Sequence, residues 1–210
     1  MPAHGRHQVR LPNSEHEGHP WVIDRVVSGF KLLDVWGLPA EGGPDEFGTL
    51  IEIMSTMDPA EGDSRATRAL FALRFRLGRW FGWDEATSKL PIPGLTETTL
   101  SSRVPEDLRD TTTRPILVSG TTFVPIYQTD DEWAAEISNS TVHAVLHLAW
   151  VDQGEDVYRG QMGIYVKPRG SFGATYMSMI APFRHLIVYP ALMRQIARAW
   201  DARPHAGSST

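Results

Sequence analysis

The chain lacks cysteine entirely. Disulfide cross-links, thiol nucleophiles and thiolate metal sites are therefore excluded. The sequence also contains no Gly-x-Gly-x-x-Gly fingerprint and no P-loop motif, so neither of these glycine-rich phosphate-binding motifs is present. We expect no bound metal and no cofactor.

Long hydrophobic runs are also missing. A membrane-spanning helix needs about 20 consecutive apolar residues, and the most apolar stretch, residues 166–200, is interrupted by Arg184 and His185. Pro182 and Pro190 each remove a backbone donor that lipid could not replace. The first 20 residues contain no apolar leader segment. We expect a cytoplasmic protein without a membrane span.

The chain also has no excess of basic residues. The net charge is −5, which argues against general nucleic-acid binding. The length of 210 residues, of which 41% are hydrophobic, predicts one domain with a real core. We place that domain at residues 21–202, between flexible tails at 1–20 and 203–210. The histidines at positions 4, 7, 16 and 19 are interpreted as part of a solvated tail.

The first half of the domain predicts a strand followed by two helices. Residues 24–36 are rich in strand-forming residues and end before a Gly-Leu-Pro turn. Apolar residues at helical spacing predict a helix over 44–57, and a second amphipathic helix from Asp63 to about Phe81. The basic side of the second helix leaves open a membrane-surface role. The polar stretch 84–113 is interpreted either as a lid or as a surface excursion.

The second half switches to a period of two residues and predicts five strands with short connections, and hence an antiparallel sheet. The segments are 114–120, 122–128, 132–138, 141–151 and 157–167. Residues 173–200 predict a C-terminal helix that prolines should segment at Ala181–Pro182 and Tyr189–Pro190. The fold class is α+β.

Alternation also separates a polar face of the sheet from an apolar face. With a two-residue hairpin at residues 139–140, charged and polar side chains align across the strands. They form two rows, Glu136–His143–Tyr165 and Glu132–His147–Gln161. The first row is a candidate for acid–base catalysis, because a carboxylate can orient and charge an imidazole. The competing interpretation is cross-strand ion pairing on a solvent-facing surface.

The apolar face is the candidate site for an apolar or amphipathic small molecule, held between the sheet and the last helix. The candidate lining residues are Trp133, Leu146, Leu148, Trp150, Met162, Ile164, Met179 and Phe183. The candidate polar anchors are Tyr176, Arg184 and His185. The alternative is that these side chains simply fill a core.

A third candidate lies in "VKPRGSFG", where a strand leads through glycines into a helix. Lys167 and Arg169, with the backbone of Gly170 and Ser171, could bind an anion. A flexible strand-to-helix turn explains the same residues.

One part of the sequence resembles a known family. "KPRGSFGATYMSMIAPFRHLI" is similar to the C-terminal signature of a bacterial family of uncharacterised domains, some of which are fused to NAD-binding, epimerase-like dehydrogenases. "RALFALRFRLGRWFGW" at 68–83 resembles the central helix of that family. The family is similar to the START/polyketide-cyclase-like superfamily, whose helix-grip fold wraps a curved antiparallel sheet around a long C-terminal helix. The chain has no NAD-binding domain, so no dehydrogenase role is implied.

Three functions therefore remain open. The first is binding of a small apolar molecule, as the helix-grip resemblance implies. The second is a cyclase, hydratase or isomerase type of enzyme that uses His and carboxylate chemistry. The third is a protein-interaction module with a tryptophan-rich surface near Trp80–Trp83.

Overall fold

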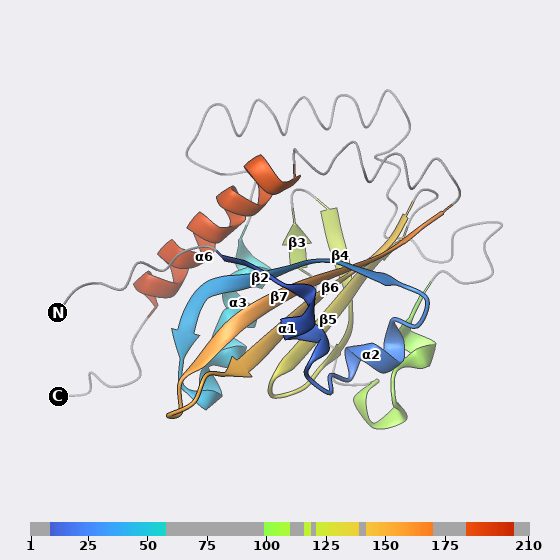
Figure 1. Ribbon diagram of the computed structural model, residues 1–210, viewed down its shortest axis with the longest axis horizontal. Helices are drawn as coiled ribbons and strands as arrows, with labels where there is room; N and C mark the ends of the chain where they lie inside the picture. Colours follow the sequence, from blue (N-terminus) through green and yellow to red (C-terminus); the bar gives the residue numbers. More distant parts are fainter. Residues whose placement is uncertain are drawn as a thin grey trace.

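The computed structural model describes residues 9–57, 99–109, 116–118, 121–138, 142–169 and 184–203. Its centre is an antiparallel sheet of seven strands in the order β1-β2-β7-β6-β5-β4-β3 (Figure 1). The strands are β1 Val9–Leu11, β2 Lys31–Gly42, β3 Ile116–Val118, β4 Thr121–Gln128, β5 Glu132–Ser138, β6 Val142–Asp152 and β7 Tyr158–Pro168. The α+β class is confirmed, with its antiparallel sheet and C-terminal helix.

The five predicted strands of the second half are present as β3 to β7. The strand predicted over 24–36 begins later. Residues Ile23–Val26 form the short helix α2, and β2 runs from Lys31 to Gly42. Gly29 separates the two elements with φ +84°, a conformation that L side chains rarely adopt.

The registers differ from the predicted ones by two residues. Ser138 pairs with His143, not with Thr141, and Val145 pairs with Tyr165. A shift of two keeps every side chain on its predicted face, because side chains alternate with a period of two. The predicted faces of the sheet are therefore correct, whereas the predicted rows are not.

One face of the sheet is covered by α3 (Phe47–Thr56) and α6 (Tyr189–Ala202). The 3-10 turn η1 (Pro44–Glu46) precedes α3, and the π-helical segment η5 (Arg184–Val188) precedes α6. Pro190, which has no N–H to donate, lies where η5 changes into α6. This change of helix type agrees with the predicted segmentation at Tyr189–Pro190. We call this face of the sheet the core face.

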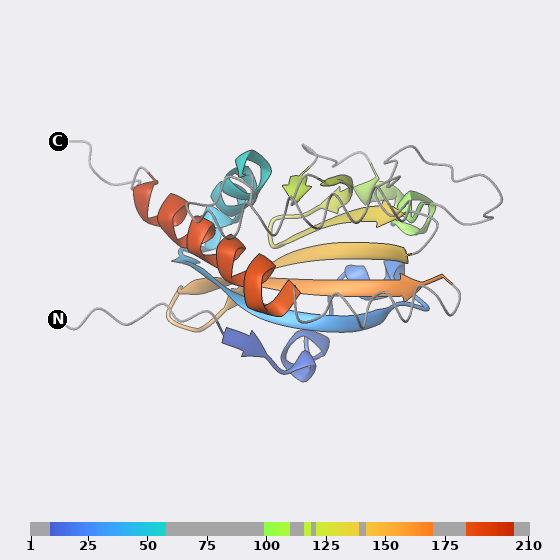
Figure 2. The same cartoon turned by 90° about the horizontal axis from the view of Figure 1, so that it is seen from above.

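The opposite face, which we call the polar face, is also covered. Over it lie α1 (Asn13–Glu17), α2 and the 3-10 turns η3 (Ser101–Arg103) and η4 (Glu106–Leu108). Figure 2 shows α1 and α3 on opposite sides of the sheet. The prediction of a flexible tail is wrong for residues 9–20, which form β1 and α1 and bury His16 completely.

Several predicted features lie outside the described residues. They are the helix at 63–81 with Trp80–Trp83, the greater part of the 84–113 stretch, and the site candidates Gly170, Ser171, Tyr176, Met179 and Phe183. No helix in the described ranges is long and apolar enough to cross a membrane.

Candidate functional site

Glu136 and His143 form a buried ion pair on the polar face. His143 Nε2 lies 2.6 Å from Glu136 Oε2, and both residues are about 1% exposed. The same carboxylate accepts hydrogen bonds from the Thr99 hydroxyl at 2.6 Å and from the Leu100 N–H at 3.0 Å. The pair therefore attaches the 99–109 segment to the sheet. The prediction of a solvent-facing surface is wrong here, because η3 and η4 cover it.

Tyr165, the third member of the predicted row, lies elsewhere. Its ring is 6.0 Å from the ring of His16. Burial, together with the negative charges of Asp24 and other carboxylates, raises the pKa of Tyr165 above its ordinary value. Its hydroxyl is buried and has no hydrogen-bond partner among the described residues. Catalysis by Glu136, His143 and Tyr165 thus stays a prediction, but without the contact to Tyr165 on which it depended.

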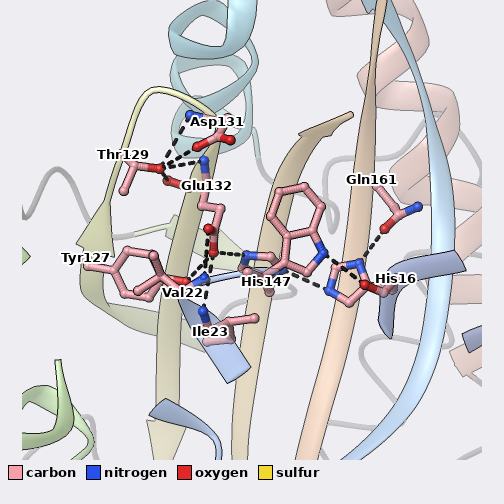
Figure 3. Close-up of polar contacts among 10 residues, drawn as sticks. His16, Val22, Ile23, Tyr127, Thr129, Asp131, Glu132, His147 and Gln161 are labelled. Atoms are coloured by element: carbon pink, nitrogen blue, oxygen red, sulfur yellow. Dashed lines mark hydrogen bonds and ion pairs between the residues drawn. The ribbon is translucent and has the colours of Figure 1, made fainter. Parts of the chain in front are cut away.

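A second carboxylate on β5, Glu132, holds the N-terminal segment in the same manner (Figure 3). Its two oxygens accept hydrogen bonds from the N–H groups of Val22 at 2.9 Å and Ile23 at 3.3 Å, at the start of α2. The Tyr127 hydroxyl donates a further bond at 2.8 Å. The ring of His147 completes the set at 3.1 Å. Burial alone would raise the pKa of Glu132, but the bonds from these donors lower it below its ordinary value.

His147 continues the network to His16 and Gln161. His147 Nδ1 lies 3.0 Å from His16 Nε2, and His16 Nδ1 forms a short hydrogen bond with Gln161 Oε1. Figure 3 shows the two rings placed end to end between Glu132 and Gln161. The chain of contacts crosses from β5 to β7 through the N-terminal helix α1.

Burial keeps the His16 ring in this network neutral near pH 7. Burial, reinforced by the charge of His147, lowers the pKa of His16 to about 4. A neutral imidazole donates from one nitrogen and accepts at the other, so His16 links the Gln161 side chain to His147.

A glycine makes room for the inserted histidine. Gly163 pairs with His147 across β6 and β7. A Cβ atom at position 163 would meet His16 Nε2 at 2.9 Å, closer than real Cβ contacts. The absence of a side chain there lets the His16 ring lie directly on the strand. Sequence reasoning misses this role of His16, because the residue lies in a polar stretch without hydrophobic periodicity.

The core face carries most of the predicted ligand-lining residues in two adjacent cross-strand rows. The rows are Trp36–Met162–Leu148–Trp133 and Asp34–Ile164–Leu146–Ala135. They pack with Trp150 and the buried side of α6 in one apolar cluster. Ile164 is only partly buried, whereas Met162 is 1% exposed. The structure thus brings together the predicted lining residues that it describes, and adds Trp36, which sequence reasoning missed.

Two tryptophans in the first row keep their indole N–H groups unpaired. Trp36 Nε1 and Trp133 Nε1 are buried and have no hydrogen-bond partner among the described residues. Trp150 and Trp200, on the same face, donate to the carbonyls of Gly43 at 2.9 Å and Glu41 at 3.0 Å. A buried donor without an acceptor costs about 1–3 kcal/mol. The two unpaired donors are therefore unusual features of this face.

Next to Trp36, a buried carboxylate holds a partly exposed histidine. Asp34 is 1% exposed and its Oδ2 lies 3.1 Å from His185 Nε2 and 3.4 Å from the Tyr189 hydroxyl. Its other oxygen contacts Arg10 at 3.0 Å. The rings of Trp36 and His185 are 6.0 Å apart. His185 was a predicted polar anchor; Asp34 was missed, although a lone acid within an apolar strand was a signal for it.

The predicted anion site is only partly described. Arg169 donates to the Ser138 hydroxyl at 2.7 Å, and the Lys167 ammonium lies 5.8 Å from the centre of the Phe30 ring. Anion binding stays a prediction. The side chain of the anchor candidate Arg184 is likewise outside the described part.

In the described ranges, no group of three or more His, Asp or Glu is arranged to hold a metal ion. A cavity of about 230 Å³ lies beside α1. Its walls include Glu15, His19, Arg159 and Gln161, so it is polar and separate from the core face.

Comparison with known families gives one match. The family described as "Protein of unknown function (DUF2867)" matches residues 26–191. The chain belongs to this family. No curated protein and no solved structure shows significant similarity to it. In this DUF2867 chain the matched residues include Asp34, Trp36, Trp133 and His185 of the core face, whereas His16 lies before them.

Proposed function

We propose that the chain binds a small, mainly apolar molecule on the core face of its sheet. The observation that supports this proposal is the pair of unpaired indole N–H groups of Trp36 and Trp133. They stand at the two ends of one row, three strand spacings or about 14 Å apart. A ligand with oxygen acceptors would satisfy either donor and so recover the cost of burying it.

The surroundings of the row fit such a ligand. Between the two tryptophans lie Met162 and Leu148, which offer only apolar surface. His185 and Asp34 provide the single polar cluster described beside the row. Pockets for small molecules are mainly apolar with a few placed polar groups. We also propose that the sheet and α6 correspond to the two halves of a helix-grip fold of the START/polyketide-cyclase-like type, which encloses ligands between them.

The test compares three tryptophan-to-phenylalanine variants. Trp36→Phe and Trp133→Phe remove unpaired donors, whereas Trp200→Phe removes a donor that is bonded to the Glu41 carbonyl. Each loses similar volume, so differences report on the N–H group. We expect the first two to bind anilinonaphthalene sulfonate, an aromatic probe with acceptor oxygens, about three- to tenfold more weakly than the wild type. Trp200→Phe should keep the affinity and lose about 1 kcal/mol more unfolding free energy than the other two.

Native mass spectrometry of protein purified from its host gives an independent measurement. A co-purifying small molecule, lost from Trp36→Phe and kept by Trp200→Phe, would support the proposal. Equal probe affinities in the wild type and all three variants would contradict it.

An enzyme of the acid–base type is the second candidate function. The observation that favours it is the contact between the buried Asp34 carboxylate and the partly exposed imidazole of His185. The corresponding pair on the polar face, Glu136 and His143, is fully covered and therefore a weaker candidate.

A further inference from the structure

Asp34 is placed to hold one nitrogen of His185. The donors around this carboxylate include Arg10, His185 and Tyr189. An oxygen of an ionised carboxylate can only accept, so the contact requires a hydrogen on Nε2 of His185. In the neutral ring the other nitrogen, Nδ1, then carries a lone pair.

The His185 ring is accessible as well as oriented. Its side chain is 29% exposed, while that of Asp34 is 1% exposed. Among the described residues no hydrogen bond is found for Nδ1. The ring belongs to the π-helical segment Arg184–Val188, and such segments frequently occur at functional sites. His185 therefore offers a fixed acceptor of protons at the border of the core face.

Trp36 brings a donor close to this acceptor. Its ring lies 6.0 Å from that of His185 and 4.8 Å from that of Tyr189. One small molecule could therefore accept a hydrogen bond from the Trp36 indole and donate a hydrogen to His185 Nδ1. A base beside a fixed donor is the arrangement that stabilises a developing oxyanion.

We propose that His185, positioned by Asp34, takes a proton from the bound molecule, whose oxygen is held by the Trp36 indole N–H. This inference rests on the proposed function. The bond from the ligand oxygen or α-carbon to hydrogen breaks, and an N–H bond forms at Nδ1. The products are a ligand anion and an imidazolium paired with Asp34, so charge and atoms balance. The ligand class is a weakly acidic phenol or an enolisable carbonyl compound with an apolar body.

The experiment uses two probes of similar shape, of which only one carries a transferable proton. 4-Nitrophenol has a hydroxyl group, and 4-nitroanisole has the same apolar body with a methyl ether. Binding is measured by calorimetry, and the absorption band of the phenolate reports whether the bound phenol has lost its proton. The buffer is slightly more acidic than the pKa of the free phenol, so that the phenolate is the minor form in solution.

We expect the wild type to bind the phenol about tenfold more tightly than the ether and to convert the bound phenol to phenolate. His185→Gln keeps a donor for Asp34 but has no basic nitrogen, so it should lose both the preference and the phenolate band. Asp34→Asn should reduce both. Binding of 4-nitroanisole by these variants is the control for folding and for an intact apolar site.

Equal affinity for the two probes in the wild type would overturn the inference and leave the binding site intact. A phenolate band that persists in His185→Gln would overturn it as well. If the wild type binds neither probe, the proposed function itself is contradicted.

Discussion

Two carboxylates on one strand explain how the polar face can be both polar and buried. Glu132 and Glu136 each receive an imidazole from β6 and backbone N–H groups from a covering segment. Breaking such a buried pair by removing one partner costs about 3–5 kcal/mol, because a charge is left without compensation. The catalytic candidate His143, and His147 beside it, therefore both lie at attachment points between layers.

At the residue scale, His16 predicts a defined pH dependence of stability. In the unfolded chain it titrates near its ordinary pKa of 6.5, and in the folded chain burial and His147 lower this pKa to about 4. Between these values only the unfolded chain binds the proton, so stability falls as the pH decreases. The loss through this window is about 3 kcal/mol.

The measurement is urea unfolding between about pH 7 and pH 4 for the wild type and for His16→Gln. The titratable groups around the ring are His147, His19 and Glu132, and they remain in the variant. Because the pKa of Glu132 is lowered in the folded chain, its contribution is lost only below about pH 4.5, at the acid end of this range. A variant with the same slope as the wild type would show that His16 is not the responsible group.

At the scale of elements, the hairpin registers in the structure differ by two residues from those predicted from the sequence. Alternation fixes which face a side chain takes, and it did so correctly for Trp133, Leu146 and Met162. Sequence alone cannot fix the length of a turn, and a change of two residues leaves the alternation intact. The contact between Glu136 and His143 is accordingly diagonal rather than directly cross-strand.

Cysteine pairs can test the β5–β6 register, because the chain contains no other cysteine. Ile137 is paired with Ala144 in the structure. The double variant Ile137→Cys with Ala144→Cys should therefore form a disulfide on mild oxidation, since directly opposite Cβ atoms are about 4.5–5.5 Å apart. Gel mobility without reductant and mass spectrometry detect the bond.

The matched control is Ile137→Cys with Val142→Cys, which is the pair that the two-residue hairpin would have placed opposite each other. It should stay reduced under the same conditions. Faster oxidation of this control than of the first pair would contradict the register.

The candidate site could be predicted only in part, for reasons that differ between its members. The apolar lining residues carry their own signal in the alternation of the strands, and His185 is visible as a polar interruption of an apolar stretch. Asp34 and Trp36 acquire their role only because β2 pairs with β7 and α6 packs across β2, which are contacts between distant segments. Whether an indole N–H finds an acceptor is decided entirely by such tertiary contacts.

At the scale of the whole molecule, the two faces of the sheet differ in how their polar side chains are bonded. On the polar face, Glu132, Glu136 and His147 bond to covering segments and His143 bonds to Glu136, whereas the Tyr165 hydroxyl has no partner among the described residues. On the core face, the indoles of Trp36 and Trp133 lack acceptors among the described residues. The first arrangement stabilises the layers, and the second is suited to a ligand. This contrast supports the proposed ligand site on the core face over a site at the two polar rows.

The hydrogen bonds of His16 on the polar face make the N-terminal segment part of the folded unit. A chain that begins at Trp21 would lack β1 and α1, and it would leave His147 Nδ1 and the Gln161 side chain without the bonds that His16 makes. Removal of a flexible tail would not change the free energy of unfolding, whereas removal of a segment that covers the sheet lowers it. We expect the shortened chain to lose about 3 kcal/mol or more of unfolding free energy, the scale of a broken buried network.

Hydrogen exchange shows where such a loss occurs. β2 is the partner of β1 and lies beside β7, so the amides of these strands should exchange faster in the shortened chain. The amides of α6, which packs on the other face, provide the internal control and should keep their relative protection. Unchanged stability together with unchanged protection of β2 would mean that residues 9–20 contribute nothing to the fold, and the covered polar face would then need another explanation.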